Sequence, residues 1–476
     1  MSIAAIGHRS DAKGRRAGLG LLLLGVAGLA TAFWGLRADV GWIAQPFYAY
    51  AWWSAIFILD GAVALIRGHS LLTTRTRLVF PMGVWSITFW FFFEFLNLRF
   101  RNWYYVEVFP GHSLADMLQA GVFTAASFST VFVGIFAWCE WLAALGRIWS
   151  RAPRTARAAS WKFPPWVSYA VQAFGAAMAL AALLSPEYLA PLIWGSFTFL
   201  VDPWNYRRGA RSILRDMEAG DWGLVGRVFL AGTLCGLLWE SLNFFAPQKW
   251  IYTVRGLESF KLFEMPLLGF FGFPALAFDA LAALSLLSSL FLGNETWEHP
   301  GDLRYEIERR PRPPRWAFWA SLPPQMAFWG LVSVLLMDVN IGSVQVEMED
   351  LALDEAEVAT LREISIGRPR QLLRAAEDPN RRREIEARLA ATAARLDGIL
   401  AEAELFTFKG IGSEFGRLLK RIGVRRSSDL RSWKPEELHA RLVEESNRAG
   451  VRPPRLDWVR AWVLAGRDGG IVQDAR

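Results

Sequence analysis

The chain has 476 residues, of which 53% are hydrophobic and only 20% are charged, and it contains 34 Phe and 24 Trp. This composition excludes an ordinary soluble protein, because soluble domains of this length carry more charge and far fewer Trp residues. Basic and acidic residues nearly balance after residue 338, so most of the formal charge of +7 belongs to the first 338 residues, where it indicates orientation in a membrane rather than affinity for nucleic acid.

The apolar residues are concentrated in runs of about 20, the length at which a helix spans a hydrocarbon core of roughly 30 Å. The first run is too long for the core of a signal peptide, and further runs follow it directly. We therefore predict nine membrane spans, at residues 17–36, 47–66, 78–98, 117–146, 165–184, 189–205, 228–246, 263–292 and 317–338.

Alternate loops between these spans are rich in Arg, and the loops on the other side are richer in Trp and Tyr. By the positive-inside rule, the Arg-rich loops and the N-terminus are cytoplasmic. Nine spans then place the tail on the non-cytoplasmic side of a bacterial-type plasma (inner) membrane. Because Pro323 and Pro324 interrupt the last predicted span, an eight-span alternative with a cytoplasmic tail stays open.

The membrane region contains an internal duplication. WSAIFILD, ending at Asp60, matches WGSFTFLVD, ending at Asp202, with a one-residue allowance at the Trp; FFFEFLN (91–97) matches LLWESLN (237–243), and Trp103-Tyr-Tyr matches Trp250-Ile-Tyr. Four spans return the chain to its starting side, so the two copies are parallel and related by an axis along the membrane normal.

The prediction is thus an all-α protein, a polytopic bundle of two parallel four-span repeats with a small soluble helical domain. Its predicted divisions are repeat 1 (1–160), repeat 2 (161–316), the ninth span (317–338), a linker with an amphipathic helix (339–403) and the C-terminal domain (404–476).

Charged residues inside the spans are costly and indicate candidate sites. Glu and Asn three residues apart share a helix face. We therefore predict that Glu94, Asn97, Glu240 and Asn243 handle a proton, a cation or a polar head group, with the interfacial Trp103 and Trp250 as further substrate-binding residues. The alternative is that the four polar residues are interhelical hydrogen-bonding partners without another role.

The intramembrane aspartates have other expected roles. Asp60 and Asp202 are expected to form salt bridges with nearby Arg67 and Arg207 or Arg208. Asp279 falls within the eighth span and has no acidic counterpart in the first copy, where Val131 stands. No hydrolase, metalloprotease, ATPase or dinucleotide motif occurs, so enzymatic activity is left open, and no cofactor or metal is expected.

The tail contains a stretch, FTFKGIGSEFGRLLKRIGV, in which Lys409, Gly410, Ile411 and Gly412 are predicted to form a hairpin between two helices, and Gly423 to end the second helix. Residues 404–467 resemble helix-hairpin-helix domains, in particular a class of unknown function that ends in a Trp-containing helix, which Trp462 matches. The resemblance implies either phosphate binding by hairpin amides or a protein-interaction module.

Two functions follow. The first is a carrier or intramembrane enzyme for a small or lipid-like substrate, and the second is a non-catalytic membrane scaffold. The expected partners are membrane lipid and a protein bound through the C-terminal domain, not nucleic acid. The helix predicted at 381–405 is expected to pack on its own domain, with homo-oligomer formation as the alternative.

Overall fold

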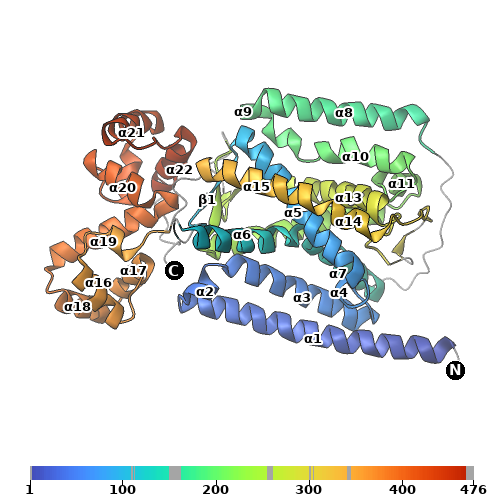
Figure 1. The fold of residues 1–476 in the computed structure, drawn as a ribbon, viewed down its shortest axis with the longest axis horizontal. Coiled ribbons are helices and arrows are strands. Elements are labelled where there is room, and N and C mark those ends of the chain that lie inside the picture. Colours follow the sequence, from blue (N-terminus) through green and yellow to red (C-terminus); the bar gives the residue numbers. More distant parts are fainter. Residues whose placement is uncertain are drawn as a thin grey trace. The chain divides into compact units, whose positions relative to one another are not determined.

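The computed structural model describes residues 3–108, 111, 113–149, 162–254, 261–299, 302–303, 305–339 and 345–467. Parts of the basic loops near 147–157 and 304–312, and the last residues of the predicted C-terminal domain, lie outside this set. The chain forms two compact units (Figure 1). The membrane unit is Met1–Phe100, Val122–Leu242 and Met265–Leu336, and the C-terminal unit is Arg101–Gly121, Asn243–Glu264 and Met337–Arg476.

Long apolar helices make up most of the membrane unit. Seven stretches among the described residues are long and apolar enough to cross a membrane, so the protein is membrane-embedded. They correspond to seven of the nine predicted spans. The helices that contain them are α1 (Ile3–Arg37), α3 (Phe47–Arg67), α5 (Thr76–Phe100), α6 (Leu114–Phe128) with α7 (Thr130–Trp149), α8 (Pro165–Leu184), α12 (Trp222–Phe245), and η2 (Leu267–Phe271) with α13 (Gly272–Phe291).

The other two predicted spans are interrupted. Residues 189–205 form a single turn, η1 (Ala190–Ile193), and then α10 (Ser196–Arg207), because Gly195 adopts a left-handed backbone with φ 88. The 12 residues of α10 rise about 18 Å, so α10 by itself is shorter than a hydrocarbon core. Residues 317–338 form α14 (Arg315–Ala320) and the 18-residue α15 (Leu322–Val339), which are separated at Ser321.

Short helices connect the long ones at both ends of the membrane unit. They are α2 (Gly41–Ala44), α4 (Leu71–Thr74), α9 (Pro186–Leu189) and α11 (Ile213–Glu218). Helix α15 packs on α5 through polar side chains, since the Thr88 hydroxyl lies 2.6 Å from Gln325 Oε1 and the indole of Trp329 donates to Thr88 Oγ1 at 2.9 Å. Such hydrogen bonds suit helix pairing in lipid, where burial of apolar surface gives little driving force.

Glycines set the closest helix contacts in the membrane unit. A Cβ atom added to Gly25 of α1 would lie 2.6 Å from the Ser54 carbonyl oxygen and 2.8 Å from the backbone nitrogen of Ile58, both in α3. A Cβ atom added to Gly175 of α8 would lie 2.7 Å from the backbone nitrogen of Leu200 in α10. Small residues therefore let α1 approach α3, and α8 approach α10, to backbone contact.

The C-terminal unit combines two loops of the membrane region with the tail. Strands β1 (Trp103–Val106) and β2 (Lys249–Tyr252) pair antiparallel into a ribbon. Strand β3 (Lys261–Leu262) follows β2 in the chain, and β4 (Met265–Pro266) begins the next segment of the membrane unit. The tail elements are η5 (Met348–Asp350), α16 (Glu355–Glu363), α17 (Pro369–Glu377), α18 (Pro379–Arg388), α19 (Ala393–Thr407), η6 (Phe408–Gly410), α20 (Gly412–Arg421), η7 (Ser427–Ser432), α21 (Pro435–Ala449) and α22 (Leu456–Arg467).

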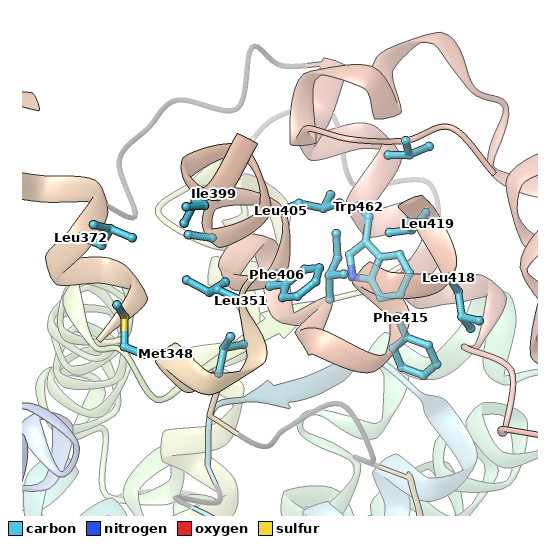
Figure 2. Packing of buried hydrophobic residues seen from close by; sticks show 14 of the residues in the cluster. Met348, Leu351, Leu372, Ile399, Leu405, Phe406, Phe415, Leu418, Leu419 and Trp462 are labelled. Atoms are coloured by element: carbon cyan, nitrogen blue, oxygen red, sulfur yellow. The ribbon is translucent and has the colours of Figure 1, made fainter. Parts of the chain in front are cut away.

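One hydrophobic core runs through this unit (Figure 2). It contains Met348, Leu351 and Leu372 from the predicted linker together with Phe406 and Trp462 from the predicted domain. Described residues between 345 and 403, in the stretch predicted as a linker with an amphipathic helix, contribute to the same core as the residues after 404. Pro369 and Pro379 lie in this stretch and occupy first helical positions, where proline is well tolerated.

Candidate functional site

The two predicted glutamates lie in the interior of the membrane unit. Glu94 belongs to α5 and Glu240 to α12, and both are 0% exposed. The indole Nε1 of Trp90, one turn before Glu94, donates to Glu94 Oε1 at 2.9 Å. A buried carboxyl group in a membrane costs a few kcal/mol, so its presence in each of two helices needs a structural or a functional reason.

Ring contacts join the helices that carry these glutamates. The ring centroids of Trp90 in α5 and Trp239 in α12 are 5.1 Å apart, and Trp239 lies 6.1 Å from Trp52 in α3. Phe93 in α5 stacks on Trp194, the residue after η1, at 4.8 Å. Tilted and stacked rings at these separations add specific attraction to the burial of apolar area. The two glutamates are thus flanked by aromatic side chains that contact one another.

Of the two predicted asparagines, Asn243 forms two hydrogen bonds to a neighbouring strand, and Asn97 is buried in its helix. Asn243 bonds to the backbone of Trp250 twice, because its Nδ2 donates to the Trp250 carbonyl and its Oδ1 accepts from the Trp250 amide, each at 3.0 Å. Both polar atoms of Asn243 therefore fix the start of β2, which is a structural role. Asn97 in α5 is buried, at 7% exposure.

The two predicted tryptophans occupy equivalent places in the ribbon. Trp103 pairs with Tyr252, Tyr104 with Ile251, and Tyr105 with Trp250. The Trp250 indole also donates to the Tyr252 hydroxyl at 2.9 Å. The first residue of each matching tripeptide therefore pairs with the last residue of the other. Two copies related by a local two-fold axis would pair in this way. Substrate binding by Trp103 and Trp250 stays a prediction.

Asp279 of α13 caps the interrupted helix α10. Its carboxylate accepts from the Gly195 amide at 2.9 Å, from the Thr198 amide at 2.7 Å and from the Thr198 hydroxyl at 2.5 Å. The first amides of a helix have no partner within the helix, and in the membrane they have no water either. Asp279 therefore satisfies donors that the break at Gly195 exposes.

Asp60 and Asp202 also bind helix starts, which corrects the predicted salt bridges with Arg67, Arg207 or Arg208. Asp60 accepts from the Leu72 amide at 3.1 Å and from the Ser70 hydroxyl at 2.5 Å, at the beginning of α4. Asp202 accepts from the Ile213 amide at 2.8 Å and the Leu214 amide at 3.1 Å, at the beginning of α11. A carboxylate at a helix N-terminus satisfies free amides and complements the helix dipole.

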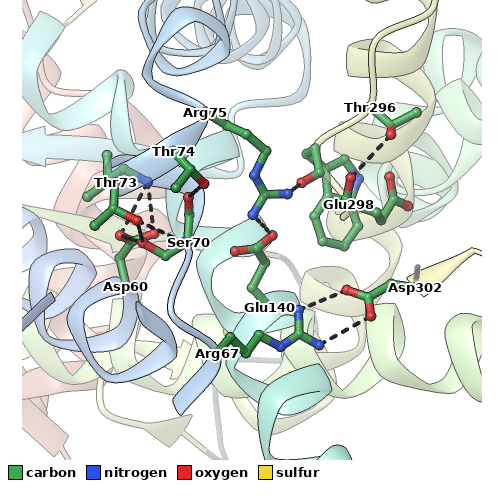
Figure 3. A network of polar contacts seen from close by, with 12 residues as sticks. Asp60, Arg67, Ser70, Thr73, Thr74, Arg75, Glu140, Thr296, Glu298 and Asp302 are labelled. Atoms are coloured by element: carbon green, nitrogen blue, oxygen red, sulfur yellow. Dashed lines mark hydrogen bonds and ion pairs between the residues drawn. The ribbon is translucent and has the colours of Figure 1, made fainter. Parts of the chain in front are cut away.

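Several arginines of the predicted basic loops form buried ion pairs with the segment that follows α13 (Figure 3). Arg67 binds Asp302 through two hydrogen bonds of 2.8 and 3.3 Å, and Arg75 binds both Glu140 and the carbonyl of Trp297. The partners of Arg67 and Arg75 are 235, 222 and 65 positions away in the sequence, so no local sequence pattern predicts this network.

A second buried cluster centres on Arg211. Its guanidinium binds Asp216 Oδ2 at 2.7 Å and Glu298 Oε1 at 2.6 Å, and it lies 3.1 Å from the Tyr305 hydroxyl. Burial raises the pKa of Asp216 to about 7, although Arg211 opposes this shift. One arginine thus binds two buried acidic side chains at a point where α11 meets the loop after α13.

The segment predicted as the tail hairpin forms the turn between α19 and α20, and it packs against β1. Lys409, Gly410 and Gly412 adopt left-handed backbones with φ 45, 74 and 71. The Lys409 carbonyl accepts from the Tyr104 hydroxyl at 2.8 Å and from the Trp462 indole at 3.2 Å, and Ile411 is fully buried. Gly423, with φ 93, follows the end of α20 as predicted. The Lys409 carbonyl and the Ile411 side chain are therefore engaged within the chain itself.

Cys139 and Cys235 are buried free thiols. Among the residues that the structure describes, no group of three or more His, Cys, Asp and Glu side chains is placed to hold a metal ion. In comparisons with known proteins, residues 352–468 match a family described as Domain of unknown function (DUF4332). That stretch contains helices α16 to α22. No curated protein and no solved structure matches the chain.

Proposed function

We propose that this chain is an integral membrane protein of two parallel four-span repeats that handles a small or lipid-like substrate, as a carrier or an intramembrane enzyme, at a site containing Glu94 and Glu240. The observation that carries the proposal is a pair of ring contacts, each of which joins a residue of one copy to a residue of the other. Counted back from Asp60 and Asp202, Trp52 matches Trp194, and in the second pair of motifs Phe93 matches Trp239.

In the structure Trp52 contacts Trp239, and Trp194 contacts Phe93. If each residue of one contact is replaced by its match in the other copy, the result is the other contact. A two-fold relation between the copies produces such a pair directly, because the first copy must then meet the second as the second meets the first. Glu94 and Glu240, each one residue after Phe93 and Trp239, then lie at the same depth on either side of the axis.

Three other features support the duplication. The aspartates of the two copies bind the amides of Leu72 and Leu214, which have the same spacing from Asp60 and Asp202. Gly25 approaches Ile58, and Gly175 approaches Leu200, the residue that matches Ile58. The ribbon pairs the matching segments in reverse register.

The ribbon also supports a parallel arrangement of the repeats. The chain enters β1 within three residues of the end of α5 and enters β2 within four residues of the end of α12. Because β1 and β2 are hydrogen-bonded to each other, the C-terminal ends of α5 and α12 belong on the same side of the membrane. An inverted repeat would place these ends on opposite sides.

The same ribbon bears on the location of the tail. The loops that contain β1 and β2 are poor in Arg, so the positive-inside rule assigns them to the non-cytoplasmic side. The tail shares a hydrophobic core with Tyr104, Val106 and Ile251 of this ribbon. We therefore propose that α14 and α15 carry the chain across the membrane a ninth time, in a bacterial-type inner membrane, to a non-cytoplasmic C-terminal domain.

Within the tail, contact of the hairpin with β1 favours a helix-hairpin-helix-like module that binds protein over one that binds nucleic acid. Val106 Cγ2 lies 2.7 Å from where a Cβ atom of Gly410 would stand, so this glycine is needed for the close approach.

Substitution of the two glutamates tests the proposed site. Glu94→Gln with Glu240→Gln keeps side-chain size and hydrogen bonding but removes both ionisable groups. We expect the double variant to lose complementation of a deletion strain while purified protein keeps its thermal stability. The matched control is Glu187→Gln, an exposed residue of α9, which should complement fully. Full complementation by the double variant would reject the site.

The scaffold function is the second candidate, and the geometry of Asn243 favours it. One of the four predicted polar site residues uses both its polar atoms on the backbone of Trp250. If the glutamates likewise serve only packing, the membrane unit anchors the tail and the tail recruits a partner. Loss of function on disruption of the tail alone, with the double glutamine variant fully active, would support this candidate.

A further inference from the structure

The tail binds the ribbon through polar contacts as well as through their shared hydrophobic core. The Lys409 ammonium binds Glu264 at 2.5 Å, and Arg370 of α17 binds Glu107 at 2.9 Å. The acidic side chains of these pairs are only 4% and 7% exposed. Glu107 follows β1, and Glu264 belongs to the chain between β2 and β4. The tail therefore has an ion pair with a loop from each proposed repeat.

Two of these four charged residues have unfavourable backbone conformations. Glu107 has φ 55 and Lys409 has φ 45, in the left-handed region that costs a non-glycine residue about 1 kcal/mol or more. Such conformations persist where the surrounding contacts determine them. The hydroxyl of Tyr104, the indole of Trp462 and the carboxylate of Glu264 all bind Lys409, which fixes this residue on three sides.

We propose that the C-terminal domain is a latch, which holds the non-cytoplasmic ends of the two membrane repeats together and must release the ribbon before they can separate there. This inference rests on the two-repeat architecture of the proposed function. Strand β1 belongs to the first repeat and β2 to the second, and residues of both strands lie in the core of the tail.

The physical argument concerns what separation would require. Moving the strands apart breaks the ribbon's backbone hydrogen bonds, and with the tail docked it also removes Tyr104, Val106 and Ile251 from a close-packed core. At least one of the pairs Lys409–Glu264 and Arg370–Glu107 would be pulled apart, leaving a buried carboxylate without its cation. A docked tail therefore stabilises the closed arrangement, and an undocked tail removes that restraint.

The chain contains its own reporters for the test. Cys139 in α7 and Cys235 in α12 belong to different repeats and are 0% and 1% exposed. In detergent-solubilised full-length protein, their rate of reaction with a small maleimide measures how often the bundle opens. This measurement needs no substrate and no growth phenotype, so it does not depend on the outcome for the glutamine variants.

The test variant is Lys409→Glu, which places two carboxylates against each other at Glu264. We expect the labelling rate of the cysteines to rise roughly tenfold, as a loss of about 1.4 kcal/mol would produce. Lys409→Glu with Glu264→Lys should restore slow labelling. The matched control is Arg417→Glu, which breaks an exposed pair with Asp350 inside the tail and should leave the rate unchanged.

Hydrogen exchange of the tail separates a released latch from an unfolded domain. The proposal requires that α19 to α22 keep their protection in Lys409→Glu while residues 103–106 and 249–252 lose theirs. Tyr104→Phe, which removes only the hydroxyl bonded to Lys409, should accelerate labelling in the same direction by a smaller factor. If the ribbon is released in either variant and the cysteines still react at the wild-type rate, the tail is not a latch.

Discussion

In the first half of the membrane unit α3 runs unbroken through 21 residues, whereas the matching stretch of the second half is interrupted at Gly195 and continues as the 12-residue α10. The position that matches Asp279 is Val131, a buried apolar residue of α7. An unbroken helix satisfies its own interior amides, so the first half needs no acceptor at this place. The second half does, and Asp279 supplies it.

This difference separates two kinds of intramembrane acid. Asp279 occurs in one half only, and a local break in the backbone accounts for it completely. Glu94 and Glu240 occur in both halves, in unbroken helices whose backbones do not require a carboxyl group. A buried acid in a membrane is therefore a stronger functional candidate when no exposed helix end lies beside it.

Removing the cap of α10 should have the largest effect on stability. Asp279→Ala leaves the Gly195 amide, the Thr198 amide and the Thr198 hydroxyl without their acceptor, at a cost of about 3 kcal/mol in the free energy of unfolding. Equilibrium unfolding in mixed detergent micelles would measure the loss. Asp279→Asn retains one acceptor oxygen and should lose less. An Asp279→Ala variant as stable as the wild type would mean that α10 does not depend on this cap.

The glycine contacts should be equally sensitive in the two halves. Gly25→Ala and Gly175→Ala each place a methyl group within 2.8 Å of backbone atoms of the facing helix, which cannot move aside as a flexible side chain would. We expect each variant to lose about 1–3 kcal/mol. Gly20→Ala in α1 is the control, since nothing lies within 4 Å of its added methyl group. A large loss at one glycine and none at the other would contradict the proposed match between α1–α3 and α8–α10.

The sequence predicted long helices well, because hydrophobic runs of sufficient length identify membrane helices with little regard to their neighbours. It did not predict the break at Gly195, since the run from 189 to 205 is mostly apolar and the acceptor that permits the break is 84 positions further along. The glycines with positive φ in the tail hairpin were predicted, because their conformation depends on the local chain.

Only part of the candidate site could be predicted from the sequence. Glu94 and Glu240 could be identified because they are repeated and are expensive to bury. The role of Asn243 could not, because it depends on how the chain turns back toward Trp250 after α12. Likewise, Lys409 was predicted as a hairpin residue, but its left-handed backbone and its pair with Glu264 depend on a loop far away in the sequence.

The smallest effect that still distinguishes the halves is expected at Asp60 and Asp202. Both accept from amides at the start of a short helix, so Asp60→Asn and Asp202→Asn should each lose about 1 kcal/mol, the worth of a charge-assisted bond replaced by a neutral one. The serines differ, because the Ser70 hydroxyl donates to Asp60 at 2.5 Å, whereas the Ser212 hydroxyl accepts from the Arg215 amide at 3.1 Å.

Ser70→Ala and Ser212→Ala separate these two arrangements. In an Asp60→Asn background, Ser70→Ala should cost less than in the wild type, since one of the bonds that it removes joins the two substituted residues and only the bond to the Thr73 hydroxyl is left to lose. Ser212→Ala should add its full cost to Asp202→Asn, because the serine and the aspartate bind different amides of α11. Measured free energies of unfolding for the two double-variant cycles decide the point. An equal coupling energy between serine and aspartate in both cycles would show that the two halves share even this hydrogen-bond network. A coupling energy in the Asp60–Ser70 cycle alone would limit the similarity of the halves to the aspartate and the helix that it caps.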